Sequence, residues 1–262
     1  MALIIVFIFG LIIGSFLNVL IWRFYTGESA IKGRSYCPKC KHRLDFFDLF
    51  PVMSFVVQGG KCRYCRGAIS WQYPIVELAT AVLFAATYII CGFFASGGPA
   101  AGGQFLILLK DWFVISVMIV IFVYDAKHYL ILDKVIYPAV VVVFIASPLL
   151  GLENSWWRGV LDGLLAAAIG GGFFLLQYVV SKGKWIGGGD VKMGFLMGLI
   201  LGIKGLLVAL FFSYIIGAVI GLILIALHRK KMQSQIPFGM FLAVGTIIAM
   251  FWGEKILRWY LG

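Results

Sequence analysis

The sequence predicts an all-α, polytopic membrane protein with about eight transmembrane helices. The chain has 262 residues, of which 62% are hydrophobic and only 13% charged, and its mean hydropathy is +1.02. A soluble domain of this size needs far more polar surface. A membrane-spanning helix needs about 20 apolar residues. Eight stretches approach this length, near 2–22, 74–95, 105–124, 135–150, 159–180, 189–203, 205–227 and 236–257.

Some of these stretches leave the number of spans open. The stretches 135–150 and 189–203 are short, and the boundary at Lys204-Gly205 is tight, so seven spans plus a re-entrant segment is an alternative. The stretch 2–22 does not resemble a cleaved signal, because Arg23 follows it and no small-x-small site comes after it. We expect it to be the first transmembrane helix.

The distribution of lysine and arginine predicts the orientation in the membrane. Nine of them lie in the loop 23–73, and the same side of the membrane collects sixteen in all against five on the other. The side that carries more basic residues is normally cytosolic. We therefore expect a cytosolic loop 23–73 and both termini outside. The net charge of +11 largely reflects this bias, so we expect no nucleic-acid partner.

The loop 23–73 carries two pairs of cysteines, separated by 21 residues. They are Cys37, Cys40, Cys62 and Cys65. Two such knuckles have the spacing of one tetrahedral zinc site, and a loop of this size gains stability from a metal. Two disulfides are the alternative, which a cytosolic location disfavours. The zinc would be structural, because four thiolates leave no position open for water.

Two aspartates, Asp125 and Asp190, stand at the cytosolic ends of apolar stretches. Carboxylates at a membrane boundary are costly and usually face a polar cavity, a partner or a substrate, although each could simply cap a helix or lie solvated in a loop. Asp190 follows Gly187, Gly188 and Gly189. Glycines admit a close backbone approach, so we expect these three to give a substrate access to the carboxylate.

A pair of carboxylates can perform acid–base chemistry if the two side chains approach closely. Like-charge repulsion then keeps one protonated while the other stays ionised. The ionised group can take a proton from water and the protonated group can donate to a peptide carbonyl, which is aspartic peptide hydrolysis. Spacing alone leaves a proton-coupled transporter open.

Two further acids, Glu77 and Asp162, have the positions of interfacial helix caps. Glu77 lies on the cytosolic side, so we regard it as the better candidate for a polar partner of the two aspartates. The run Gly170-Gly171-Gly172 predicts close packing of helices, because small residues admit a neighbouring backbone.

With these features, the chain resembles the type IV prepilin peptidases, a family of bacterial membrane aspartic proteases. The resemblance rests on motifs that follow one another in order along the whole chain. They are Gly14-Ser15-Phe16-Leu17-Asn18-Val19, the two cysteine knuckles, Asp48-Leu49-Phe50-Pro51, the run 69–77, Asp125, Gly187-Gly188-Gly189-Asp190-Val191-Lys192 and Ile236-Pro237-Phe238-Gly239.

The resemblance implies a concrete activity. Such enzymes remove the basic leader of type IV prepilins and type II secretion pseudopilins after a glycine at the cytosolic face, and many then methylate the new N-terminus with S-adenosylmethionine. Asp125 and Asp190 match the catalytic aspartates, and the four cysteines match the zinc ligands; no residue can be named for the methyl donor. Leu132 and Met240 stand where the family often has proline. We expect these two departures to affect local helix geometry and not the aspartates.

Together these observations predict a catalytic membrane protein of the bacterial cytoplasmic membrane, with prepilins, pseudopilins and the lipid bilayer as its partners. We expect the first transmembrane helix at 1–22, the cytosolic zinc-binding loop at 23–73 and a membrane catalytic domain at 74–262. A proton-coupled transporter or a non-catalytic secretion assembly factor is the alternative. A transporter would be favoured by charged residues that cross the bilayer, and the sequence has none at mid-span depth.

Overall fold

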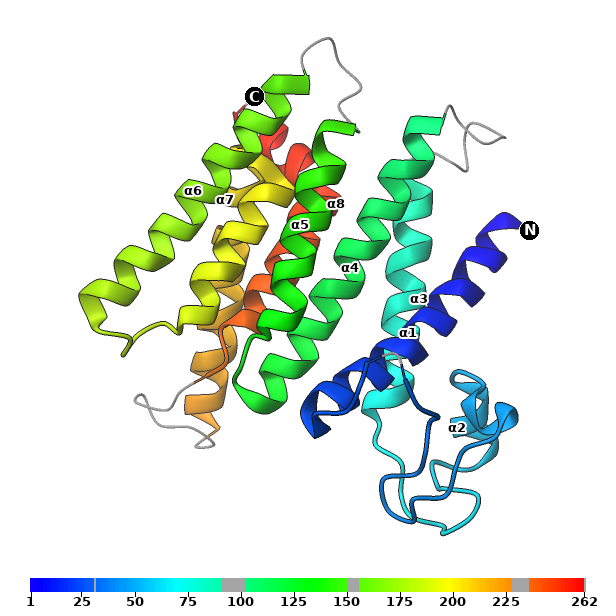
Figure 1. Cartoon of the computed structure of the whole chain (residues 1–262). Coiled ribbons are helices and arrows are strands. Elements are labelled where there is room, and N and C mark those ends of the chain that lie inside the picture. The colour runs from blue at the N-terminus through cyan, green and yellow to red at the C-terminus, as the bar shows by residue number, and fades with distance from the viewer. Residues whose placement is uncertain (31, 91–101, 150–155, 228–235, 262) are drawn as a thin grey trace. The chain divides into compact units, whose positions relative to one another are not determined.

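A computed structural model describes residues 1–30, 32–90, 102–149, 156–227 and 236–261 (Figure 1). Within these ranges the regular elements are helices, and extended pairing is limited to two isolated bridges, which confirms the all-α prediction. The elements are α1 (Ala2–Thr26), η1 (Phe46–Leu49), α2 (Met53–Val57), α3 (Gln72–Ile90), α4 (Gly102–His128), α5 (Asp133–Leu149), α6 (Trp156–Ser181), α7 (Gly188–Ala226) and α8 (Gly239–Leu261).

Six of the described helices are long and apolar enough to cross a membrane, namely α1, α3, α4, α6, α7 and α8. The helix α5 has 17 residues and is about 26 Å long at 1.5 Å per residue, which agrees with the short stretch seen in the sequence. The predicted ends at 91–95 and 150 lie outside the described residues. Once α7 is divided into its two arms, α1, α3 to α6, the two arms and α8 make eight helices in the described residues, which is close to the predicted number of about eight spans.

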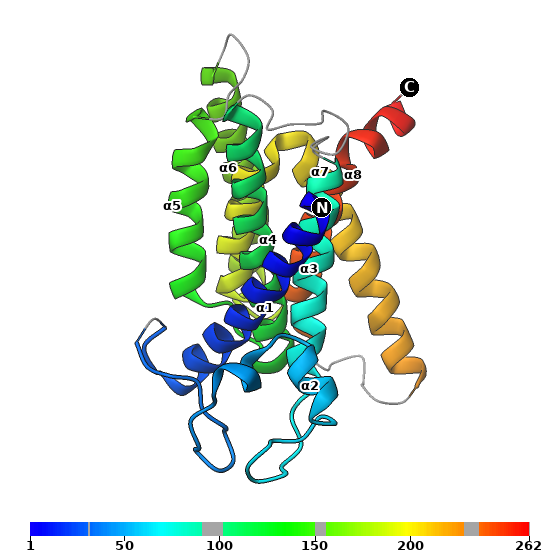
Figure 2. The ribbon, with the colours of Figure 1, turned by 90° about the vertical axis from the view of Figure 1, so that its right-hand side faces the viewer.

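The helix α7 is a hairpin of two arms, because its backbone breaks at Gly202, where φ is 65° and ψ −178°. Phe173 and Phe174 are neighbours on α6, yet Phe174 lies against Gly194 of the first arm and Phe173 against Tyr214 of the second. In a straight helix Gly194 and Tyr214 would be about 30 Å apart. The arms therefore run back along one another (Figure 2).

Gly202 can adopt this left-handed backbone because it has no Cβ. The second arm then starts with a cap, since the N–H of Ile203 donates to Oδ2 of Asp162 at 3.3 Å. Asp162 therefore acts as a cap, as its position suggested, but for the second arm of α7 and not for its own helix α6. The break lies two residues before the boundary expected at Lys204-Gly205.

The described chain packs as two compact units, Met1–Ala100 with Asp111–Val120, and Ala101–Lys110 with Ile121–Gly262. In the first unit α1 crosses α3 (Figure 1), where Gly10 lies directly against the backbone of Ala81. The buried Asn18 side chain joins the same two helices: it donates to the carbonyl of Tyr73 at 3.1 Å and accepts from Gln72 at 3.0 Å. The second unit contains both aspartates.

In the second unit α6 and the first arm of α7 pack through small residues. Gly170 lies against the carbonyl of Gly194, and Gly198 lies against the backbone of Ala166. Ala166 is fully buried. Such contacts let two backbones approach where lipid provides no hydrophobic drive, so they hold the start of α7 in place. The packing predicted for Gly170 is confirmed.

Candidate functional site

Asp125 lies in the last turn of α4 and reaches the first turn of α8. The residue is only 4% exposed, and its Oδ2 accepts the N–H of Met240 at 3.0 Å. The first four N–H groups of a helix have no partner within that helix, so a carboxylate there satisfies an orphan donor. It also lies at the positive end of the helix dipole, which stabilises a negative charge.

Asp190 also accepts a main-chain N–H group at the start of a helix, in this case α7. It is 7% exposed, it stands in the first turn of α7, and its Oδ2 accepts the N–H of Gly187 at 3.0 Å. Gly187 is the extended residue that precedes the helix. Both aspartates are therefore buried carboxylates, each held by a main-chain donor at a helix N-terminus.

Ile131 connects the starts of α7 and α8, and so brings the two aspartates into one site. This side chain is 8% exposed. A Cβ on Gly189 would lie 2.9 Å from Cβ of Ile131, and a Cβ on Gly239 would lie 2.7 Å from its Cδ1 and 2.9 Å from Oδ2 of Asp125. Gly189 and Gly239 thus allow close packing beside the two carboxylates, because both pack against the one side chain of Ile131.

The sequence reasoning missed Ile131 and misjudged Met240. The expectation that Met240 leaves the aspartates untouched is wrong, because its main-chain N–H binds Asp125 directly. A proline at position 240 has no N–H and could not make this bond. Ile131 has no distinguishing signal in the sequence, because it is one apolar residue in the short connection between α4 and α5, and only the structure shows that it is buried.

The three glycines before Asp190 have different surroundings. Only Gly189 is tightly packed against protein. A Cβ on Gly188 would meet nothing within 4 Å, and one on Gly187 would lie 3.6 Å from Oδ2 of Asp190. The space beside Gly187 and Gly188 is therefore open, as a substrate backbone would require.

Glu77 has its own partner in the first unit. Its carboxylate is 6% exposed and accepts the N–H of Val52, a residue of the loop between α1 and α3, at 2.7 Å. Its role as a polar partner of the two aspartates stays a prediction, whereas its contact with the loop is a feature of the structure.

The two cysteine knuckles are built alike. In the first, the N–H of Cys37 donates to the carbonyl of His42 at 2.9 Å, and in the second the N–H of Cys62 donates to the carbonyl of Gly67 at 2.8 Å. Lys41 and Arg66, each directly after the second cysteine of its pair, have left-handed φ angles of 60° and 57°. Each knuckle is thus a tight turn that directs two sulfurs the same way.

The four sulfurs fit one zinc ion. All lie within 4.8 Å of one another, and the Sγ atoms of Cys37 and Cys65 are 3.9 Å apart. A tetrahedral site with Zn–S bonds of about 2.3 Å separates its sulfurs by about 3.8 Å. Burial would raise the pKa of the Cys37 thiol, but hydrogen bonds, led by the backbone of Cys40 and Lys39, outweigh it and lower the pKa to about 7. A thiol of this pKa readily gives a thiolate. The pKa of the Cys40 thiol is instead raised to about 11, because the hydrogen bond to the backbone of His42, which would lower it, is outweighed by desolvation and by the thiols of Cys37 and Cys65.

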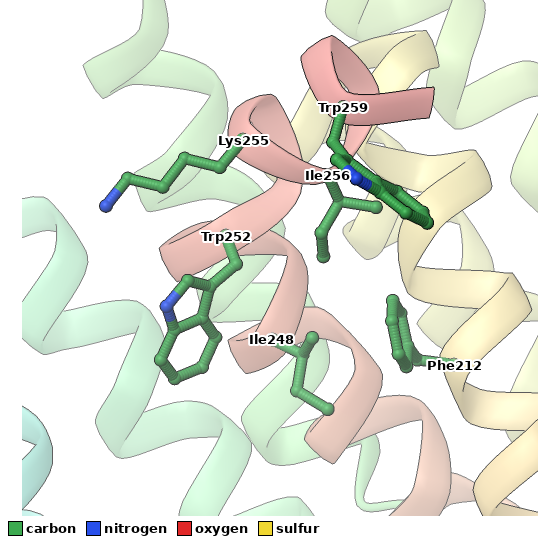
Figure 3. Close-up of a pocket in the computed structure, with 6 residues that line it drawn as sticks. All are labelled: Phe212, Ile248, Trp252, Lys255, Ile256 and Trp259. Atoms are coloured by element: carbon green, nitrogen blue, oxygen red, sulfur yellow. The ribbon is translucent and has the colours of Figure 1, made fainter. Parts of the chain in front are cut away.

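A separate apolar pocket of about 450 Å³ lies towards the C-terminal end of α8 (Figure 3). Its lining residues are Phe212, Ile248, Trp252, Lys255, Ile256 and Trp259. Trp252 stands twelve residues beyond Met240, which is about 18 Å along a helix. This pocket has no carboxylate in its lining and is distinct from the site of Asp125 and Asp190.

Comparison with known proteins identifies two family models along the chain. The bacterial peptidase A24 N-terminal domain matches residues 8–91, and the type IV leader peptidase family matches residues 112–222. The first match contains the cysteine knuckles, and the second contains both aspartates. No solved structure matches the chain.

Curated relatives cover nearly the whole length. A prepilin leader peptidase/N-methyltransferase of Bacillus subtilis is 36% identical over 260 residues, covering 98% of this chain and 97% of the relative. The proteins of the same name from Pseudomonas aeruginosa and Legionella pneumophila are each 31% identical, covering 96% and 97% of this chain and 91% and 93% of the relatives. The chain therefore belongs to the type IV leader peptidase family.

Proposed function

We propose that this protein is a membrane aspartic endopeptidase that removes the basic leader of type IV prepilins and type II secretion pseudopilins. Cleavage follows a glycine at the cytosolic face, and the new N-terminus is then methylated. The observation that carries this proposal is the meeting of two buried carboxylates, Asp125 and Asp190, at two helix N-termini in a chain of this family.

The two carboxylates divide the proton transfers between them. The ionised aspartate takes a proton from water as its oxygen attacks the scissile carbonyl carbon, and the protonated aspartate gives its proton to the carbonyl oxygen. When the C–N bond breaks, the aspartate that took the proton from water gives it to the leaving nitrogen, and a hydroxyl of the tetrahedral intermediate returns a proton to the other aspartate. The N–H groups of Gly187 and Met240 hold the carboxylates in place throughout, since main-chain donors need no reorganisation.

Two further groups take part. Zinc bound by Cys37, Cys40, Cys62 and Cys65 stabilises the loop and has a structural role. S-adenosylmethionine supplies the methyl group; we place its pocket on the cytosolic side near the zinc loop, close to where the new amine emerges. Methyl transfer depends mainly on positioning and does not require two carboxylates that share a proton.

The proposed location is the bacterial cytoplasmic membrane, with the zinc loop in the cytosol and both termini outside. The excess of lysine and arginine in the loop 23–73 supports this orientation. The division at 1–22, 23–73 and 74–262 remains the proposed functional organisation: an anchoring helix, a zinc loop and a catalytic membrane domain.

The purified protein, incubated with a prepilin and S-adenosylmethionine, tests the proposal. Mass spectrometry of the pilin should show loss of the leader and gain of one methyl group on the new N-terminus. An intact prepilin after incubation with folded protein would contradict the peptidase assignment, and cleavage without methylation would leave a peptidase alone.

Alanine substitutions at Gly188 and Gly189 are expected to differ in their physical effect. Gly189→Ala crowds Ile131, and overpacking of about 1–3 kcal/mol should lower the melting temperature and displace Asp190. The methyl group added by Gly188→Ala would contact no protein atom, and alanine favours a helix over glycine by up to about 1 kcal/mol. The melting temperature of this variant should therefore not fall. Its cleavage rate should nevertheless fall, because the methyl group occupies the space of the substrate backbone. Wild-type cleavage by Gly188→Ala would exclude the access role of this glycine.

Asp190→Asn is expected to separate the two activities. It should fail to cleave a prepilin but should still methylate a mature pilin supplied with a free N-terminus, because that reaction needs no shared proton. The measurement is transfer of labelled methyl from S-adenosylmethionine, with wild type as the control. Loss of transfer in the variant alone would show that both reactions use the aspartates.

A further inference from the structure

The loop between α1 and α3 exposes an apolar surface formed by η1 and α2, which we call the loop patch: Phe46, Phe47, Phe50, Met53, Val56 and Val57. Phe46 is 72% exposed and Val57 80%, which exceeds the exposure of the outward-facing Ile75 (58%) and Val82 (56%) on the spanning helix α3. Large contiguous apolar surfaces of soluble segments usually mark an interaction site.

The members of the loop patch form two groups, one around η1 and one on α2, and these two elements pack against each other. The rings of Phe46 and Phe50 meet edge to face with centroids 5.5 Å apart, and Phe46 also contacts Phe47 at 5.9 Å. Met53 and Val57 are four residues apart on α2 and so share one of its faces.

The opposite side of α2 is fixed to the start of α3. Phe55 packs on Trp71 with ring centroids 4.9 Å apart, and Trp71 directly precedes α3. At the beginning of α2, the N–H of Val52 donates to the buried Glu77 carboxylate at 2.7 Å. The start and the middle of this short helix are therefore held at the beginning of α3.

Glu77 sets the depth of the loop patch. It stands five residues beyond Gln72, the first residue of α3, which is about 7.5 Å along the helix axis. Segments that lie in a membrane interface bury their apolar face about 5–10 Å into the boundary between headgroups and acyl chains. The start of α2 is thus held at the level of the first two turns of a membrane-spanning helix.

The backbone of Val52 shows that this position is enforced. Its φ of 58° and ψ of −48° are unfavourable for a β-branched residue. Such a conformation persists only where its surroundings determine it, and here the carboxylate of Glu77 binds the N–H of that same residue.

We propose that the loop patch is embedded in the lipid bilayer, where it anchors the zinc loop to the membrane interface at the face where α3 begins. The charge of the loop complements a bilayer with anionic headgroups, because its knuckles expose Lys39, Lys41, Arg43, Lys61, Arg63 and Arg66. Basic residues beside an apolar, aromatic surface are typical of interfacial segments. The patch holds the knuckles against the membrane surface independently of any substrate.

The depth of a nitroxide label tests this proposal. The label is attached at position 57 through a ketone-bearing amino acid, which leaves the cysteines intact, in the full-length protein within vesicles of phosphatidylethanolamine and phosphatidylglycerol without substrate. Collisions with oxygen, which concentrates in lipid, should exceed those with a water-soluble nickel complex. The matched control is position 63 of the same loop, where the nickel complex should dominate.

Glu77 variants test the attachment. Glu77→Ala should shift the label at position 57 towards water, whereas Glu77→Gln, which keeps an acceptor oxygen, should hold it in lipid. A label at position 57 that is as accessible to nickel as the one at 63 would overturn the proposal and leave the loop patch as a surface for a protein partner. An unchanged depth in Glu77→Ala would overturn the role of Glu77. Neither result depends on cleavage activity.

Discussion

Asp125→Asn and Asp190→Asn, each made singly, are expected to reduce leader cleavage by at least about 10³-fold, the scale of general acid–base catalysis. An amide can neither take the proton of the attacking water nor donate one to the carbonyl oxygen. The asparagine Oδ1 can still accept the N–H of Met240 or Gly187, so the helix ends keep their caps and the fold should survive. The rate of leader release, followed by mass spectrometry, measures the loss.

Asp133→Asn is the matched control for both variants. Asp133 is the first residue of α5, and its carboxylate pairs with the ammonium group of Lys192 at 2.5 Å. Lys192 follows Asp190 by two residues, but the side chains of this ion pair are both substantially exposed. Exposed ion pairs contribute about 0–1 kcal/mol, so this variant should retain cleavage within a few-fold of wild type. If Asp125→Asn or Asp190→Asn cleaved the leader as fast as Asp133→Asn does, the substituted aspartate would have no part in the mechanism.

Cys37→Ser is expected to cause the second largest effect, loss of zinc and of the folded loop. The wild type should hold about one zinc per chain, and binding free energy at such sites is folding free energy. A serine cannot supply the buried thiolate, so the packing of the two knuckles on one another should be lost. Elemental analysis gives the metal content, and limited proteolysis within 27–71 reports the loop.

The control for this experiment is Cys91→Ser, the same chemical change at the cysteine outside the two pairs. It should leave zinc content and protease resistance unchanged. Wild-type protein that contains no zinc when freshly prepared under reducing conditions would contradict the metal assignment, whatever the behaviour of the variants.

Side-chain chemistry and hydropathy predicted most of the fold, because each helix of a membrane protein is specified by a local apolar stretch. The position of the break in α7 was less predictable. Gly202 and Gly205 both suit a turn, and the choice involves Asp162, some forty residues earlier, which caps Ile203. A contact across that sequence separation leaves no periodic signal.

The candidate site shows the same limit. The aspartates and cysteines could be predicted because their side chains are unusual for their surroundings. Met240 could not, since its contribution is an N–H group that nearly every residue type possesses. Ile131 could not be distinguished from other apolar residues until Gly189 and Gly239 were seen to pack against it.

The main-chain origin of the donors to Asp125 and Asp190 has an evolutionary consequence. A side-chain donor can be deleted by many single substitutions, but the N–H groups of Gly187 and Met240 can be deleted only by proline. Drift in the side chain at position 240 can therefore alter the neighbourhood of a carboxylate without removing its hydrogen bond. The hydrogen bond to Asp125 therefore tolerates every substitution at position 240 except proline, which has no N–H to donate.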